Sequence, residues 1–402
     1  MFRFLILIPW IVVATGAGPQ GASVNDVIRG NNQFALDLYG KARARSGNVF
    51  FSPYSVSTAL ALTYSGANGE TASEMAATLH FPTDRAALEA GFAGLIDQTL
   101  GGDPKKPYQL DTANALWGQS GLDYRADFLE RSSSLYKATL HPLDFLANPD
   151  AARRTINDWV EQRTHEKIKN LLAPGTIQRE TDLILTNAIY FKAAWMKPFA
   201  KSATTDQDFL GSTGKVTVPL MNKLGQFSYL DVESDHLQIL DLPYSGGAIS
   251  MSILLPKAMD GLGPLESTLT ARKLEDWLSR LEASRQVNLT LPRFQMEQSF
   301  ELGTTLKELG MSRAFGPQAD FSGITTSRHL HLSNVIHKAF IDVNEEGSEA
   351  AAATAIIMGR TAVMVPQKPV VNFRADHPFL FLIRDHRSGS ILFIGRVTDS
   401  GK

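Results

Sequence analysis

The chain has 402 residues and is 44% hydrophobic, which is enough for one large core or two ordinary ones. Lys and Arg total 39 against 41 for Asp and Glu, so no net charge points to nucleic acid, an anionic membrane or another polyanion as a partner. The chain contains no cysteine, which excludes a cysteine nucleophile, thiolate-bound metal and disulfides.

The first residues have the three-part layout of a secretory signal peptide. Arg3 precedes an apolar run over residues 4–14, and small residues follow up to Ala17. A membrane anchor would need about 20 apolar residues, and this run is shorter. We therefore predict cleavage after residue 17 and export of residues 18–402 to the extracellular space or the periplasm. No later stretch is long and apolar enough to predict a membrane span.

Helical and strand-like patterns follow one another irregularly along the remaining chain. Apolar residues at helical spacing mark three predicted helices: Phe34 with Leu38, Ile156 with Trp159 and Val160, and Leu302 with Leu306 and Leu309. Runs rich in β-branched and aromatic residues predict strands over 182–193, 250–255, 287–294 and 335–343. Apolar runs over 379–383 and 391–394 predict a buried hairpin. With no repeat or linker, the sequence predicts one α+β domain.

Motifs for catalysis or metal binding are missing from the sequence. There is no nucleophile elbow and no phosphate-binding loop, and His165-Glu166 lacks the second histidine of a zinc metalloprotease motif. His329 and His331 would share one face of a strand, but no third ligand lies nearby in sequence, so we interpret them as surface histidines. Asn288 begins an acceptor triplet that matters only in a host that glycosylates. We predict no catalytic residue, no metal and no cofactor.

One connection is unusually long. About thirty residues separate the strand that ends at Val343 from the strands that begin near Phe373, more than an ordinary loop needs. By propensity the four alanines at 350–353 favour a helix, which Ser348 could cap. The same residues also fit a strand with one small, uncharged face, formed by Ser348, Ala350, Ala352 and Thr354. In that interpretation Gly347 is the hinge, because glycine adopts any backbone angle freely.

This segment resembles the insertion hinge of inhibitory serpins. The resemblance covers the following residues: Glu345, Glu346, Gly347, Ser348, Glu349, Ala350, Ala351, Ala352, Ala353 and Thr354. It continues through motifs in the same order as in the family, at 48–55, 66–71, 187–195, 337–338 and 376–381, and so covers nearly the whole mature chain. The resemblance implies a single domain of three β-sheets and about nine helices, with an exposed reactive loop over about 344–366.

The resemblance also implies a function. In the family, a serine protease cuts the exposed loop, an acyl-enzyme forms, and the hinge inserts into the central sheet and deforms the protease. The chain would then be an irreversible suicide-substrate inhibitor of serine proteases, acting as a monomer, and not an enzyme. The alternative is a non-inhibitory serpin that serves as a carrier, chaperone or storage protein. The small, uncharged residues at alternate hinge positions favour inhibition.

Specific residues follow from the resemblance. Those similar to the family's sheet-opening region are Ser52, Ser55, Asn187, Trp195 and His337. The four polar ones would form a hydrogen-bonded latch, although each is also compatible with an ordinary buried polar group, and Trp195 with a plain core aromatic. The family's spacing places the cut between Thr361 and Ala362, which we favour over Arg360–Thr361; Met358 and Met364 are further possibilities. Thr361 suggests elastase-like or subtilisin-like proteases, and Arg360 trypsin-like ones.

Overall fold

The computed structural model describes residues 20–101, 106–348 and 369–400, with side chains from Val24 on. Within these ranges the chain forms nine α-helices: α1 (Gln20–Ala42), α2 (Pro53–Tyr64), α3 (Gly69–Thr78), α4 (Arg85–Leu100), α5 (Ala126–Tyr136), α6 (Pro149–Arg163), α7 (Leu262–Thr268), α8 (Ala271–Ser279) and α9 (Gly303–Glu308). The strands are β1 (Val49–Phe51), β2 (Tyr108–Gln119), β3 (Thr139–Leu143), β4 (Leu183–Ala194), β5 (Thr205–Gly211), β6 (Gly214–Val232), β7 (Leu237–Pro243), β8 (Ile249–Pro256), β9 (Glu282–Pro292), β10 (Phe294–Glu301), β11 (Leu332–Val343), β12 (Gly347–Ser348), β13 (Val371–Arg374), β14 (Phe379–Asp385) and β15 (Ile391–Val397).

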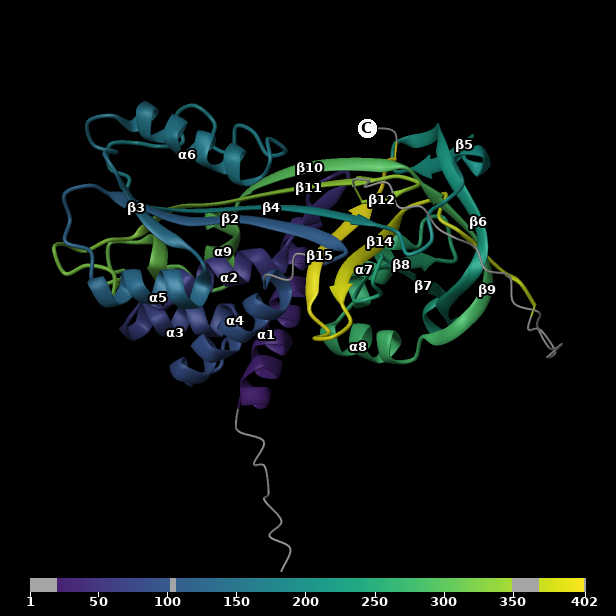
Figure 1. The fold of residues 1–402 in the computed structure, drawn as a ribbon, viewed down its shortest axis with the longest axis horizontal. Helices are drawn as coiled ribbons and strands as arrows, with labels where there is room; N and C mark the ends of the chain where they lie inside the picture. The colour runs from purple at the N-terminus through teal and green to yellow at the C-terminus, as the bar shows by residue number, and fades with distance from the viewer. Residues whose placement is uncertain (1–19, 102–105, 349–368, 401–402) are drawn as a thin grey trace, which may run out of the picture.

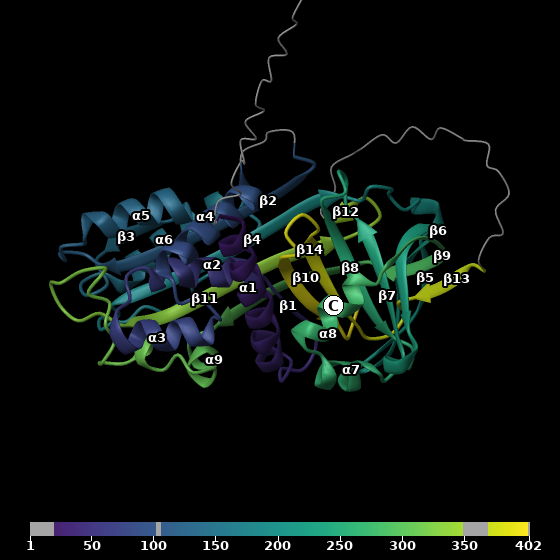
Figure 2. The same cartoon turned by 90° about the horizontal axis from the view of Figure 1, so that it is seen from below.

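The strands form two hydrogen-bonded sheets, seen from two directions in Figures 1 and 2. The six-stranded sheet has the order β10-β11-β12-β4-β2-β3, and the nine-stranded sheet the order β1-β15-β14-β8-β7-β6-β9-β13, with β5 added to β6. Two of the three sheets implied by the resemblance are joined here, because the 19-residue β6 pairs with β7 in one part and with β5 and β9 in another. The predicted α+β class is confirmed.

The six-stranded sheet is covered on both faces. Helix α6 lies over one face, and α2 to α5 lie on the other (Figure 1). Strand β4 contributes alternate residues to two separate apolar clusters, Leu185 and Ile189 to the main core and Ile184 and Ala188 to a smaller cluster beneath α6. The cover on the α6 side is therefore packed independently of the main core.

One junction in this sheet positions the site. Strands β4 and β11 pair in parallel from Leu183 opposite Leu332 to Tyr190 opposite Phe340, and we call this pair the seam. Beyond Tyr190 the two strands separate and admit β12, which is antiparallel to both. Their outer neighbours, β2 and β10, are also antiparallel to them. The sheet is thus closed along the seam and open at one end of it.

The predicted elements compare well with the observed ones. Each of the three apolar stripes lies on or at the ends of a helix, namely α1, α6 and α9, and the predicted C-terminal hairpin is β14 with β15. The predicted strand over 287–294 is in fact the end of β9 and the start of β10, because the chain passes at Arg293 from the nine-stranded sheet to the six-stranded sheet. No helix within the described ranges is long and apolar enough to cross a membrane. The predicted signal peptide lies outside those ranges.

Candidate functional site

The open end of the seam holds the first two residues of the predicted inserting strand. Gly347 pairs with Ala194, and Ser348 pairs with Ala193 on β4 and with Val343 on β11. A Cβ on Gly347 would lie 2.1 Å from the carbonyl oxygen of Ala193, so the close backbone approach requires glycine. Of the two interpretations of the alanine-rich segment, the described part is strand. The remaining hinge residues 349–354 and the predicted reactive bond at 360–362 lie outside the described residues.

Trp195 lies beside the open end of the seam. We call this open end, where Gly347 and Ser348 pair with Ala194 and Ala193, the mouth. Its indole stacks on Tyr244 with ring centroids 4.4 Å apart, and its Nε1–H donates to the carbonyl oxygen of Asn344 at 2.9 Å. The hydroxyls of Tyr244 and Ser348 are 2.6 Å apart and fully buried. Burial raises the pKa of Tyr244, so its hydroxyl stays neutral. The stacked rings of Trp195 and Tyr244 therefore form one wall of the mouth, and Tyr244 hydrogen-bonds the hydroxyl of Ser348.

Two glutamates before the hinge are held in different ways. Glu345 is 2% exposed, and its Oε1 accepts from Thr204 Oγ1 at 2.5 Å and from Arg293 Nε at 2.8 Å. Burial would raise the pKa of Glu345, but the hydrogen bonds from Arg293 and Thr204 outweigh it and hold the pKa below its usual value. Glu346 has a side chain that is 34% exposed and pairs with Lys201 at 2.7 Å. The turn into β12 is thus anchored chiefly by Glu345.

The predicted latch residues meet halfway along the seam. The backbone N–H of Ser52 donates to Nε2 of His337 at 3.1 Å, so the ring proton must be on Nδ1, which donates to Oδ1 of Asn187 at 2.5 Å. His337 and Asn187 are also register partners on β11 and β4. Complete burial lowers the pKa of His337 to about 3, so the ring is neutral at physiological pH.

The amide of Asn187 extends the latch toward α2 and β2. Its Nδ2 donates to Ser55 Oγ at 2.5 Å, to the Ser55 carbonyl at 3.0 Å and to Oδ1 of Asn114. Ser52 Oγ accepts from the Ser55 N–H at 3.1 Å and donates to the Leu392 carbonyl at 2.6 Å. Each of these buried groups has a partner, which is what a stable buried polar cluster requires. We define the latch as Ser52, Ser55, Asn114, Asn187 and His337.

Several site residues carry no signal in the sequence. Asn114 enters the latch because the antiparallel register of β2 and β4 sets it opposite Asn187. Tyr244, Arg293 and Thr204 reach the mouth from separate segments. Sequence spacing therefore does not predict that these residues meet.

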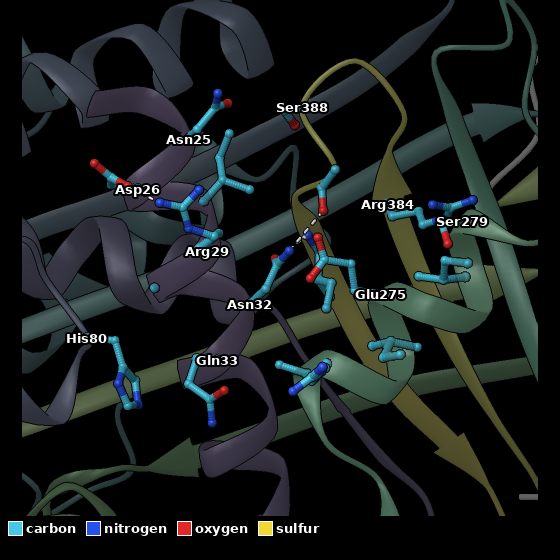
Figure 3. Close-up of a pocket in the computed structure, with 18 residues that line it drawn as sticks. Asn25, Asp26, Arg29, Asn32, Gln33, His80, Glu275, Ser279, Arg384 and Ser388 are labelled. Atoms are coloured by element: carbon cyan, nitrogen blue, oxygen red, sulfur yellow. Dashed lines mark hydrogen bonds and ion pairs between the residues drawn. The ribbon is translucent and has the colours of Figure 1, made fainter. Parts of the chain in front are cut away.

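A separate cavity of about 770 Å³ lies between α1, α8 and the β14–β15 turn (Figure 3). Its wall combines apolar side chains such as Ile28 and Leu274 with charged side chains of both signs, among them Arg29, which pairs with Asp26, and Glu275. Asn32 closes one side by donating from Nδ2 to the Gly389 carbonyl at 2.9 Å. The cavity shares no lining residue with the mouth or the latch.

The fold and the short strand β12 at the open end of the seam agree with one protein family. Residues 29–400 match the family model described as serpin (serine protease inhibitor). The chain therefore belongs to the serpin family.

Its relatives are spread across distant organisms. A serpin-like protein of Thermococcus kodakarensis is 41% identical over 92% of this chain and 85% of the relative. The leukocyte elastase inhibitor of Bos taurus is 40% identical over 92% of this chain and 98% of the relative. Among solved structures, human thyroxine-binding globulin complexed with thyroxine superimposes with a TM-score of 0.85 at 31% identity, covering 94% of this chain and all of that one. Uncleaved ovalbumin gives 0.83 at 28% identity, covering 93% and 100%.

Proposed function

We propose that this serpin is an irreversible suicide-substrate inhibitor of serine proteases and has no enzymatic activity of its own. The observation that carries the proposal is β12, in which Gly347 and Ser348 already form the first two pairs of a strand between β4 and β11. After cleavage of the loop, residues 349–354 extend this strand into the seam. Extension adds backbone hydrogen bonds on both sides of the new strand and covers apolar surface, so the uncut protein is a kinetically trapped state.

The register at the mouth specifies how the hinge would lie. Each further residue opposes the preceding residue of β4, since Ser348 faces Ala193; Glu349 then opposes Lys192, and Ala352 opposes Ile189. Positions opposite the core-facing residues of β4 receive only small, uncharged side chains, namely Ser348, Ala350, Ala352 and Thr354. Glu349 falls beside the partly exposed Lys192, where its charge is paired and stays near water.

The protease partner and the cellular location are parts of the proposal. We place the cut at Thr361–Ala362, with Arg360–Thr361 as the alternative; the first fits elastase-like and subtilisin-like enzymes, the second trypsin-like ones. The relatives named leukocyte elastase inhibitor support the elastase-like class. We further propose that residues 1–17 are a signal peptide and that the mature protein acts as a secreted monomer.

Inhibition is tested by incubating residues 18–402 with pancreatic elastase, trypsin and subtilisin. We expect a covalent complex on a denaturing gel with at least one protease, and mass spectrometry of the released C-terminal peptide identifies the cut. Ala352→Arg places a charge against the core and turns inhibitor into substrate, whereas the outward-facing Glu349→Gln keeps inhibition. Cleavage by every protease without a complex or loss of protease activity would contradict the proposal.

The cavity beside α1 supports a second candidate function, a carrier of a small ligand. Its volume of about 770 Å³ lies within the range of ligand sites, roughly 300–1,000 Å³. Apolar side chains beside charged groups of both signs suit an amphipathic ligand, and the structurally similar thyroxine-binding globulin was solved as a complex with thyroxine. Titration with 8-anilinonaphthalene-1-sulfonate, compared between the wild type and Leu274→Glu, tests this function. Binding that the substitution leaves unchanged excludes this cavity as the site.

A further inference from the structure

The closed end of the seam carries an ion cluster that joins its two strands, in which a buried carboxylate is held by two partly exposed cationic or imidazole side chains. Asp182 directly precedes β4, and His331 directly precedes β11. His331 Nδ1 lies 2.8 Å from Asp182 Oδ2, and an Arg328 guanidinium nitrogen lies 2.5 Å from Asp182 Oδ1. The N–H of Asp182 donates to Ser333 Oγ at 2.9 Å. We call Asp182, Arg328 and His331 the clasp.

The carboxylate at the centre of the clasp is kept charged by its partners. The Asp182 side chain is only 6% exposed, and burial alone would raise its pKa, but His331 and Arg328 outweigh burial and lower it. Tyr124 is the other titratable group that interacts with Asp182, and burial raises its pKa to about 12, so it stays neutral. His331, whose side chain is 36% exposed as expected for a surface histidine, is also paired with a carboxylate from a distant segment. In the described ranges, no group of three or more His, Asp or Glu side chains could hold a metal ion.

We propose that the clasp is the last restraint that a strand entering the seam must break. The mouth, the latch and the clasp lie in that order along β4, at Ala193, Asn187 and Asp182. From Ala193 to Asp182 is 193 minus 182, or 11 residues, and roughly 36 Å at ~3.3 Å per residue. An entering strand can fill the seam from the mouth to the latch while the clasp holds. β4 and β11 separate completely only when Asp182 leaves Arg328 and His331.

The functional role of the clasp rests on the proposed insertion. Its effect on the opening of the seam can be measured without insertion. Opening of the closed end occurs in the uncut protein too, and hydrogen exchange reports it. The clasp controls the final stage of insertion, when an attacked protease either is trapped or escapes. Weakening it therefore changes the partition between covalent complex and cleaved inhibitor, and leaves the initial attack on the loop unchanged.

A matched control exists in the other sheet. Asp241 is equally buried and is also held by a histidine and an arginine, His386 at 3.0 Å and Arg384 at 3.4 Å, but it lies on β7 away from the seam. Asp182→Asn and Asp241→Asn thus each remove a buried carboxylate charge that a histidine and an arginine hold, although Asp241 also accepts from Ser250 and Ser252. Only the first lies between β4 and β11.

Hydrogen exchange of the full-length uncut protein, read by mass spectrometry, tests the clasp. We expect exchange in peptides spanning 183–187 and 332–336 to be about tenfold faster in Asp182→Asn, and within about twofold of wild type in Asp241→Asn. Arg328→Gln and His331→Gln should act in the same direction, and they serve if Asp182→Asn fails to fold. Unchanged exchange at these peptides, or an equal effect of Asp241→Asn, overturns the proposal. If the wild type forms no complex with any protease, inhibition fails while the exchange result still decides the clasp.

Discussion

His337 and Asn187 face each other across the seam, joined by a 2.5 Å hydrogen bond from the imidazole Nδ1–H to the amide oxygen. The Ser52 N–H fixes this tautomer by donating to the opposite ring nitrogen. A protonated ring would lose that acceptor and leave a buried N–H without a partner. The latch therefore depends on a neutral histidine, which has a consequence for pH.

Stability should fall below about pH 6.5 because of His337. Its pKa is about 3 in the folded protein against 6.5 for an unburied histidine. The unfolded chain binds a proton as the pH drops below 6.5 and the folded chain does not, so the stabilisation present above pH 6.5 is lost toward pH 3. The slope reaches about 1.4 kcal/mol per pH unit for this one group.

Guanidinium unfolding between pH 8 and 4 checks this expectation. The wild type is compared with His337→Gln, which cannot titrate in this range. The difference between the two unfolding free energies should shrink as the pH falls. Parallel profiles would show that His337 does not control the acid response.

Replacing Gly347 should displace β12 from the mouth. The added methyl of Gly347→Ala meets the Ala193 carbonyl, a backbone atom that cannot rotate away. We expect a loss of about 1–3 kcal/mol in the free energy of unfolding and a lower fraction of covalent complex. Gly40→Ala is the control, since a Cβ there meets nothing within 4 Å in helix α1. Equal melting temperatures for the two variants would contradict the close approach.

The bond between Tyr244 and Ser348 can be measured by a double-mutant cycle. Tyr244→Phe keeps the ring that stacks on Trp195 but leaves the Ser348 hydroxyl without its partner. We expect each single variant to lose about 1–2 kcal/mol, and the double variant with Ser348→Ala to lose less than their sum. The measurement is chemical unfolding of the uncut protein. Strict additivity would mean that the hinge hydroxyl does not engage the mouth.

The two glutamates before the hinge should differ in importance. Glu345→Gln removes the charge that Arg293 and Thr204 hold in a buried position, and should cost about 1–3 kcal/mol. Glu346→Gln removes an exposed pair with Lys201 and should cost less than about 1 kcal/mol. Because the pKa of Glu345 lies below its usual value, its contribution is present above about pH 4.5 and is lost as the pH falls further. Thermal unfolding at pH 7 compares the variants, and equal losses would contradict this ranking.

Much of the fold could be predicted because local pattern and burial agree. The apolar runs that form β4, β8, β14 and β15 are buried along nearly their whole length, so composition alone marks them. The boundary at Arg293 was missed, although Pro292 and the charged Arg293 interrupt the apolar run between β9 and β10. The junction of two sheets through β6 depends on pairings between distant strands.

The site was predictable only in part. Gly347 and Ser348 were identified through the resemblance to the serpin hinge, because propensity alone favours a helix, while small residues at alternate positions are compatible with a strand buried between two others. Asn114 and Asp182 could not be found, because each gains its role from a strand register that no local spacing reveals. The surface position expected for His331 agrees with its 36% exposed side chain, but its pairing with Asp182 could not be predicted, because Asp182 lies 149 residues away in sequence.

The parallel pairing of β4 and β11 marks the place where the sheet separates most easily. From β10 across to β2, the other neighbouring pairs are antiparallel, and parallel pairing is slightly weaker per residue. Under the proposed function, a strand that continues β12 exchanges one parallel ladder for two antiparallel ladders with every step. The direction in which the new strand grows is then set by the directions of the existing strands and not by any single side chain.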